Sequence, residues 1–380
     1  MEKPLAKQLE CIRLIQNKFM PTTSSSSAGP NLTGANYVGR LFVRYGLAFL
    51  IFLMVGRVLF NALVAYWQAT HPAPPPAPTV GFGILPNLNF PSQDETDKPA
   101  SYSLEMAYGI EEITDRSKVF LITKSTANLL ADERIKEIAS IYGFIFTPEN
   151  IADKTYRFTK NTPLDMSLEI SSVDFTFSMK SNFLSRPDLL ADKALLPEEF
   201  EAIDSVKEFV SSSNLLGADI ASASGQVTFL RSIGGELRTA FSLSEADFLQ
   251  IDLNRSPIDL VYKVYTSEWN KGIISAKLSS AFSSNNSIVE MDYYYRQVDY
   301  LNFETYPLRT AKSAWNLVQA GDAYVINGKN LKEAVIREVE LAYYDSFDEQ
   351  KYLQPIYVFK GDANFMAIVP AVSANYLSRN

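Results

Sequence analysis

The pattern of hydrophobic positions divides the chain into a long apolar run, a proline-rich stretch and a longer region of short alternating segments. Residues 45–67 carry only Arg57 and Asn61 as strongly polar side chains. About 20 apolar residues suffice for a helix to cross a bilayer core of about 30 Å. A cleaved signal has a shorter apolar core near the N-terminus, of about 7–15 residues. We therefore expect a transmembrane helix at residues 41–68, with a buried helix of a soluble domain as the alternative.

Basic residues flank the apolar run on one side only. Six lysines and arginines precede it, and none follows it before Lys98. Cytoplasmic segments next to a span are enriched in lysine and arginine. The sequence therefore predicts a single-pass protein of the cell membrane, with a cytoplasmic tail at residues 1–40 and an extracytoplasmic C-terminal region.

Arg57 lies near the middle of the expected span, where an arginine costs about 2.5–3.5 kcal/mol on insertion scales. Asn61 follows four residues later and so lies on the same helix face. A polar pair on one face favours contact with a partner helix in the membrane, either another protein or a second copy. The alternative is that Arg57 extends its side chain to the interface, or that the span shifts in register.

Residues 69–97 form the expected linker. Its prolines favour polyproline II, which makes a stiff spacer. It also carries apolar side chains that are unusual for a linker. We expect these side chains to lie extended across the exterior domain, and the alternative is a docking strip for another protein. The residues of this strip are Phe82, Ile84, Leu85, Leu88 and Phe90.

From residue 98 the pattern predicts an α+β fold. Residues 131–144 repeat apolar side chains at the spacing of an amphipathic helix. Further helices are expected to begin at Pro197, a residue suited to the first helical position, and near residue 309. Strand patterns with period two follow each helix. We therefore expect three units of helix plus antiparallel sheet, at residues 98–195, 196–306 and 307–380.

Several local features carry sharper expectations. The alternation from Val173 to Met179 predicts a strand with one buried face. Phe200 is expected on the buried side of the second helix, and Gly217 at its end. Gly234 and Gly235 are typical of a hairpin turn. The third helix is expected to end at Gly321 and to bury an apolar stripe made of Ala311, Ala314, Trp315 and Val318.

Aromatic residues gather after the second unit's strands. Tyr293 and Tyr295 are expected to face the core, because they alternate with polar positions. The remaining aromatic side chains are candidates for a surface that stacks on a glycan or a peptide, and core and sheet packing is the alternative. These candidates are Tyr294, Tyr300, Phe303 and Tyr306.

Cysteine, histidine and charge limit the chemistry. The only cysteine is Cys11 and the only histidine is His71, so the region after residue 98 has no Ser-His-Asp triad, no Cys-His pair and no histidine-bearing zinc site. From Lys98 onward the chain has 38 acidic and 28 basic residues, a net charge of −10. That charge argues against nucleic acid and against docking on anionic lipid. We expect no cofactor and no metal.

Two enzymatic routes remain open to such a chain. One uses paired carboxylates, as in glycoside hydrolysis, with Glu290 and Asp292 or Glu338 and Glu340 at alternate strand positions. We interpret these pairs as a solvated sheet face. The other is a Ser-Lys dyad of Lys312 and Ser313, which is poor because adjacent helix residues point apart.

The third unit resembles a known family. Its helix has the core pair Ala314 and Trp315, its first long strand ends in Tyr343 and Tyr344, and a Tyr-Leu-x-Pro strand begins at Tyr352. This pattern resembles the C-terminal unit of bacterial PepSY-like proteins of the YycH/YycI type, over about 60 residues. The resemblance implies a single-pass protein with an extracytoplasmic α+β region that regulates a membrane histidine kinase. It carries no catalytic residue to this chain.

Together these patterns predict a membrane-anchored binding or regulatory protein that acts through protein contacts at the cell envelope, and not an enzyme. Two alternatives stay open. The first is a structural component of an envelope assembly, in which the stiff linker sets the height above the membrane. The second is a cell-wall hydrolase that uses carboxylates.

Overall fold

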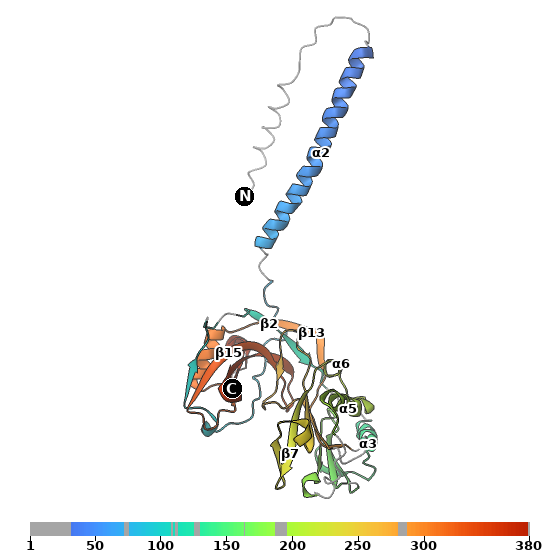
Figure 1. The fold of residues 1–380 in the computed structure, drawn as a ribbon, viewed down its shortest axis with the longest axis vertical. Helices are drawn as coiled ribbons and strands as arrows, with labels where there is room; N and C mark the ends of the chain where they lie inside the picture. Colours follow the sequence, from blue (N-terminus) through green and yellow to red (C-terminus); the bar gives the residue numbers. More distant parts are fainter. Residues whose placement is uncertain are drawn as a thin grey trace. The chain divides into compact units, whose positions relative to one another are not determined.

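A computed structural model describes residues 32–71, 76–107, 109–110, 113–124, 130–162, 164–186, 196–279 and 287–378. The chain separates into two compact units, residues 1–76 and 77–380 (Figure 1). Most of the expected cytoplasmic tail, with Cys11, lies outside the described residues.

The described residues of the first unit form one long helix, α2 (Leu32–Thr70). Within its part Asn36–Thr70, the most apolar stretch of 18 residues has a mean hydropathy of 2.3, and none of that stretch is buried within the structure. This confirms a helix that is long and apolar enough to cross a membrane. It begins nine residues before the expected span and ends two residues after it. Arg57 and Asn61 are both exposed on α2.

The second unit is α+β, as expected, and contains two sheets. Among the described residues, its helices are α3 (Ala131–Ile141), α5 (Glu199–Ser212), α6 (Ala218–Ala221) and α7 (Ala311–Ala320). The strands are β1 (Ser101–Leu104), β2 (Arg116–Ile122), β3 (Glu149–Ala152), β4 (Thr155–Lys160), β5 (Met166–Ser171), β6 (Phe177–Ser181), β7 (Gln226–Ile233), β8 (Glu236–Thr239), β9 (Phe248–Leu253), β10 (Val264–Tyr265), β11 (Ile274–Ser279), β12 (Ile288–Tyr293), β13 (Val298–Pro307), β14 (Tyr324–Ile326), β15 (Glu333–Tyr344), β16 (Tyr352–Gly361) and β17 (Met366–Pro370).

The eight-stranded sheet has the order β1-β15-β16-β17-β14, with β10 and β2 paired beside it and β13 beyond β2. The helix α7 packs on one face, where Trp315 meets Phe359. The opposite face buries Ile356 and Val358 of the same strand β16. A strand that is covered on both faces reads as a continuous apolar run, and β16 is buried at its first eight positions.

Part of the second face is covered by residues 79–90, which we call the covering segment. Leu85 donates its backbone N–H to Tyr376 O at 2.8 Å, and Phe90 stacks on Tyr324 with ring centroids 5.1 Å apart. Leu85 and Leu88 are buried. The expectation that this apolar strip lies across the domain is therefore confirmed. A partner could reach Leu85 or Leu88 only after the segment detached, whereas Ile84 stays 69 % exposed.

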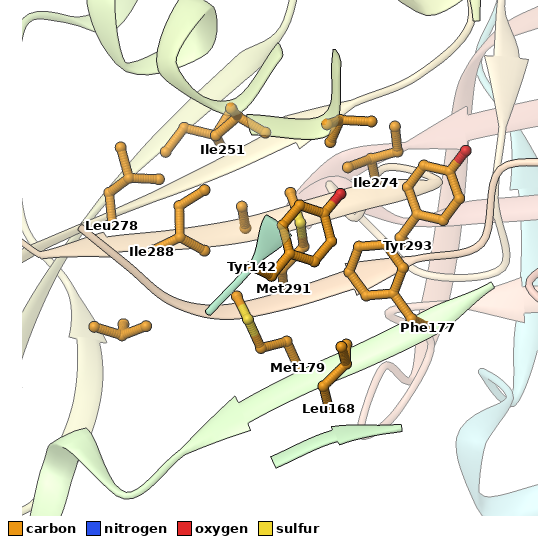
Figure 2. Close-up of a cluster of buried hydrophobic side chains, with 14 of the residues drawn as sticks. Tyr142, Leu168, Phe177, Met179, Ile251, Ile274, Leu278, Ile288, Met291 and Tyr293 are labelled. Carbon is orange, nitrogen blue, oxygen red and sulfur yellow. The ribbon is translucent and has the colours of Figure 1, made fainter. Parts of the chain in front are cut away.

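The nine-stranded sheet has the order β3-β4-β5-β6-β12-β11-β9-β7-β8, and each pair is antiparallel. The helices α3 and α5 pack on one of its faces, joined by a stack of Tyr142 on Phe209 at 4.2 Å (Figure 1). Figure 2 shows the core beneath them, where Phe177 stacks on Tyr293 and Met179 lies near Met291. The expected inward positions Tyr293 and Tyr295 are both buried.

The two sheets draw strands from more than one of the expected units. Strands from 98–195 and from 196–306 share the nine-stranded sheet, so the boundary at residue 195 falls inside it. β1 and β2 instead join the sheet built mainly from residues after 307. Antiparallel strands do follow α3, α5 and α7, as the repeat pattern predicts.

Local expectations are wrong at two places in the chain. The alternation from Val173 to Met179 is not one strand, because the chain turns between β5 and β6. Asp174 causes this turn: its Oδ1 accepts the Thr176 hydroxyl at 2.9 Å, and Phe175 adopts a φ of 59°. A short polar side chain that bonds the neighbouring backbone and hydroxyls competes with the strand ladder.

The second correction concerns α5, which begins at Glu199 and not at Pro197. Its buried stripe is Ala202, Val206 and Val210, so Phe200 falls on the outer face and is 74 % exposed. Gly217 does not end this helix; it precedes α6. A Cβ at Gly217 would lie 2.0 Å from the Tyr295 hydroxyl, so this close approach requires glycine.

The third helix and two turns agree with the sequence. The Thr310 hydroxyl accepts the Ser313 N–H at 3.1 Å and starts α7, and Gly321 ends it with a φ of 81°. All four residues of the expected stripe are buried. Gly234 and Gly235 form the turn between β7 and β8, both with positive φ.

A tight turn at residues 258–262 holds two residues other than glycine in the left-handed region. Asp259 has a φ of 51° and Leu260 a φ of 61°. This conformation strains a leucine by about 1–2 kcal/mol, whereas asparagine tolerates it. We expect Leu260→Asn to raise the free energy of unfolding by about 1 kcal/mol, measured by thermal unfolding. The exposed Leu301→Asn, which relieves no left-handed residue, serves as the control, and equal effects of the two would contradict the strain.

Candidate functional site: a cleft between the two sheets

Five charged residues, which we call the arginine cluster, lie where the two sheets meet. Arg255 stands in the loop after β9, Asp219 in α6 and Arg296 between β12 and β13. Asp174 belongs to the turn between β5 and β6, and Asp345 is the first residue after β15. The cluster therefore joins the nine-stranded sheet to the end of the eight-stranded one.

Arg255 is the centre of the cluster, and its side chain is fully buried. Its Nε lies 2.7 Å from Asp345 Oδ2, and its Nη1 lies 2.7 Å from Asp219 Oδ2. Its Nη2 donates to the carbonyl of Arg296. The guanidinium also lies over the Tyr295 ring, 4.5 Å from the centroid. Buried charges persist when they are paired and hydrogen-bonded in this way.

Two tyrosines complete the hydrogen bonds of Asp219. Tyr295 donates to Oδ1 and Tyr300 to Oδ2, each at 2.8 Å. Burial alone would raise the pKa of Asp219, but Arg255 and the two phenols hold that pKa below its usual value. For Asp345, burial outweighs the attraction of Arg255 and raises the pKa. Burial also raises the pKa of both tyrosines, so they remain neutral donors.

Arg296 makes the second link between the sheets. Its Nε lies 2.9 Å from Asp174 Oδ2, and its Nη1 donates to Phe347 O at 3.1 Å and to Asp348 O at 3.2 Å. The same side chain thus holds the β5–β6 turn of one sheet and the loop that follows β15 in the other. Several hydrogen bonds on one guanidinium fix its direction.

The pKa of Asp174 makes this link sensitive to acid. Burial would raise the pKa, but the Ser171 hydroxyl, Arg296 and Thr176 lower it below 3.8. The ionised carboxylate therefore stabilises the fold above that pH, and the contribution disappears as pH falls through the folded-state pKa.

We expect Asp174→Asn to lower the free energy of unfolding by about 1–2 kcal/mol at neutral pH. The variant and the parent should converge as pH falls below 3.8, in chemical denaturation at a series of pH values. A difference that is the same at neutral pH and at the acid end would contradict the assignment of Asp174 as a paired carboxylate.

A cleft of about 890 Å³ opens beside the cluster, and we call it the inter-sheet cleft. Its size falls within the range of small-ligand and peptide pockets, about 300–1,000 Å³. Gln350 Oε1 is buried and has no hydrogen-bond partner among the described residues. The lining combines apolar and aromatic side chains with Lys124, Lys351 and Arg296. Its other main residues are Leu121, Val173, Phe175, Asn214, Leu215, Tyr293, Tyr295, Gln297, Glu349 and Gln350.

The four aromatic residues singled out in the sequence lie in different surroundings. Tyr306 is fully buried and donates to Gly83 O at 3.0 Å, whereas Tyr294 packs on Phe347 at 5.3 Å. Tyr300 belongs to the arginine cluster. Of the four, only Phe303 is classed as exposed, at 41 %. The structure therefore does not bring the four together on one surface.

The carboxylate pairs lie in ion pairs on sheet faces. Glu290 lies 2.9 Å from Lys277, and Asp292 lies 3.3 Å from Lys271. Glu340 lies 2.7 Å from Lys360, which also approaches Glu338 at 3.7 Å. Within the described ranges, no three histidine, cysteine or acidic residues are placed to hold a metal ion.

Comparisons with known proteins give distant structural similarities. A crystal structure of an uncharacterized protein from Eubacterium rectale is 10 % identical, with a TM-score of 0.34 over 72 % of this chain and 89 % of that one. The YpeB C-terminal domain of Bacillus megaterium is 10 % identical, with a TM-score of 0.31 over 66 % of this chain and 95 % of that one. No protein-family model and no curated protein matches the sequence. The resemblance to the YycH/YycI type stays a prediction.

Proposed function

We propose that this chain is a membrane-anchored binding protein of the cell envelope, whose inter-sheet cleft holds a short segment of a partner protein. α2 anchors it, with the N-terminus in the cytoplasm and residues 77–380 outside. The observation that carries the proposal is the cleft itself, a hollow of about 890 Å³ held open beside a buried, fully hydrogen-bonded arginine cluster.

The lining indicates the chemistry of the segment. Phe175, Tyr293 and Tyr295 offer apolar and aromatic surface for one bulky side chain. Lys124 and Lys351 bring positive charge to the edge of the inter-sheet cleft, which suits an acidic residue next to the bulky one.

Regulation follows if occupancy of the cleft changes how the two sheets are held. The cleft is bordered by Arg296 and Asp174, and these same residues link the sheets. A segment that contacts this pair binds one arrangement of the sheets better than another, which is what a regulatory protein requires. The membrane helix would carry a second contact through Arg57 and Asn61.

Photocrosslinking from the rim of the cleft tests the proposal. Glu349 is exposed and lines the cleft, so it can be replaced by benzoylphenylalanine in the full-length protein in its native membranes. Glu236, exposed on β8, is the matched control position. We expect a crosslinked partner from position 349 only, with mass spectrometry placing the link in one short segment.

A cleft-filling variant makes this test specific. Gln297 is exposed at the cleft, and Gln297→Trp should fill part of it and abolish the crosslink from position 349. Phe200→Trp, on the outer face of α5, should leave the crosslink intact. Binding in the cleft would be contradicted if the crosslink from position 349 survived Gln297→Trp. It would also be contradicted if position 236 gave the same crosslinked partner in equal yield.

A further inference from the structure

Two neighbouring loops of the second unit expose large apolar side chains. Leu260 is 91 % exposed and Val261 is 70 % exposed in the turn at 258–262. Leu301 is 94 % exposed on β13, with Phe303 beside it. We call these four residues the apolar rim. Contiguous exposed apolar residues mark contact with a protein, a ligand or a membrane.

The backbone is built to project the two leucines. The β2–β13 ladder breaks between Asp299 and Phe303, so the intervening residues bulge outwards. Asp299 Oδ1 accepts the backbone N–H of Leu301 at 3.1 Å and fixes this bulge. On the other loop, Leu260 sits in the left-handed conformation. Strained or bulged backbone that exposes a leucine is a feature that folding alone does not favour.

Lys118 holds the two loops side by side. Its Nζ lies 2.8 Å from Asp259 Oδ1 and 5.1 Å from the centroid of the Phe303 ring. The pairing with Asp259 also neutralises the charge of Lys118. The other charged side chains beside Leu301 and Phe303 on β13, Asp299 and Glu304, are acidic, and Lys263, which follows Val261 by two residues, lies 3.8 Å from Glu340. The rim is therefore apolar and not cationic, so attraction to anionic headgroups does not explain it.

The chain itself limits how far the rim can lie from the membrane helix. α2 ends at Thr70, and Thr79 donates its backbone N–H to Thr305 Oγ1 at 3.0 Å. The nine residue-to-residue steps from Thr70 to Thr79 span at most about 32 Å at full extension, whatever the orientation of the two units. Thr305 lies on the same strand as Leu301 and Phe303.

We propose that the apolar rim inserts into the interface of the membrane that holds α2. Side chains of this kind reach about 5–10 Å into the headgroup and acyl boundary. The short tether keeps the rim within reach of that surface, so modest apolar burial is enough to hold it there. This contact is independent of what the inter-sheet cleft binds.

Lipid-specific quenching tests the contact on the full-length protein in phosphatidylcholine nanodiscs. In a Cys11→Ser background, single cysteines at Leu260 and Leu301 carry an environment-sensitive fluorophore. Phe241→Cys is the control, because Phe241 is 98 % exposed and follows β8 at the edge of the other sheet. We expect lipids with spin labels near the headgroup to quench most of the emission from positions 260 and 301, and to leave position 241 unchanged.

The quenching should persist between about 0.1 M and about 1 M salt, because apolar insertion is not screened. Equal, weak quenching at all three positions would overturn the proposal. A blue-shifted emission at 260 and 301 without quenching by lipid would also overturn it, since a partner protein or a second copy would then cover the rim. Thermal unfolding that matches the parent protein confirms that each labelled variant is folded.

Discussion

Replacing Arg255 by alanine is expected to lower the free energy of unfolding by about 3–5 kcal/mol, the largest effect of any single substitution considered for the folded unit. Arg255 is fully buried between Asp219 and Asp345. Its removal leaves two buried carboxylates without their main counter-charge, and it also breaks one of the two links between the sheets. Chemical denaturation of the full-length protein in detergent measures this difference.

The pH dependence of the Arg255→Ala variant checks the cause. Without the guanidinium, the pKa of both Asp219 and Asp345 rises, because burial then acts on each carboxylate without the attraction of Arg255 to oppose it. A raised folded-state pKa favours the protonated form, so the variant should regain stability as pH falls towards the usual carboxyl range. Arg337→Ala is the control: Arg337 is half exposed and pairs with Asp362 and Glu105 at the surface, where ion pairs add little. If Arg255→Ala lowered the free energy of unfolding no more than Arg337→Ala does, the stabilising role of the arginine cluster would be contradicted.

Replacing Arg57 by leucine is expected to make membrane insertion more favourable and, at the same time, to weaken association with a partner helix. An arginine at mid-span opposes insertion by about 2.5–3.5 kcal/mol, so Arg57→Leu should insert more favourably by at least that amount. If Arg57 and Asn61 contact a partner helix, the same change should abolish a crosslink formed from a reactive group at Leu53, one turn away on the same face. Insertion is read from a glycosylation-mapping assay, and association from the crosslinked product on a gel.

Leu59→Ala provides the matched control, because Leu59 lies on a different face of α2 from Arg57. It should leave both insertion and the crosslink unchanged. A crosslink that survives Arg57→Leu would show that the polar pair does not form the contact. A crosslink that joins two copies of the chain would identify self-association.

Elements with strong local signals could be predicted from the sequence. α7 has a capping threonine, a terminal glycine and a four-residue stripe, and each feature appears in the structure. The long apolar run likewise predicts α2. The prediction of one strand at residues 173–179 is wrong because the hydrogen bonds of Asp174 form a turn within the alternating pattern. The prediction for Phe200 is wrong because the buried stripe of α5 is Ala202, Val206 and Val210, which leaves Phe200 on the outer face. Periodicity reports which residues are apolar, and hydrogen bonds from polar side chains decide where an element stops.

The candidate site was out of reach of sequence patterns. Asp219, Arg255 and Asp345 are separated by tens of residues and stand in a short helix and two loops, so no spacing connects them. Only the pairing of the sheets brings them together. One weak signal existed, because Asp345 directly follows a strand whose last residues are buried. The covering segment was easier to interpret, since a row of apolar side chains in a linker has to be buried somewhere.

The central claim is that α2 crosses a membrane and that residues 77–380 lie outside the cytoplasm. A protease-cleavable tag fused after Asn380 tests it in intact cells or spheroplasts. The account predicts that added protease removes the tag without any permeabilisation, while the protein stays in the membrane fraction after washing with high salt. A tag that is cleaved only after the membrane has been opened, or a protein that washes off, would contradict it.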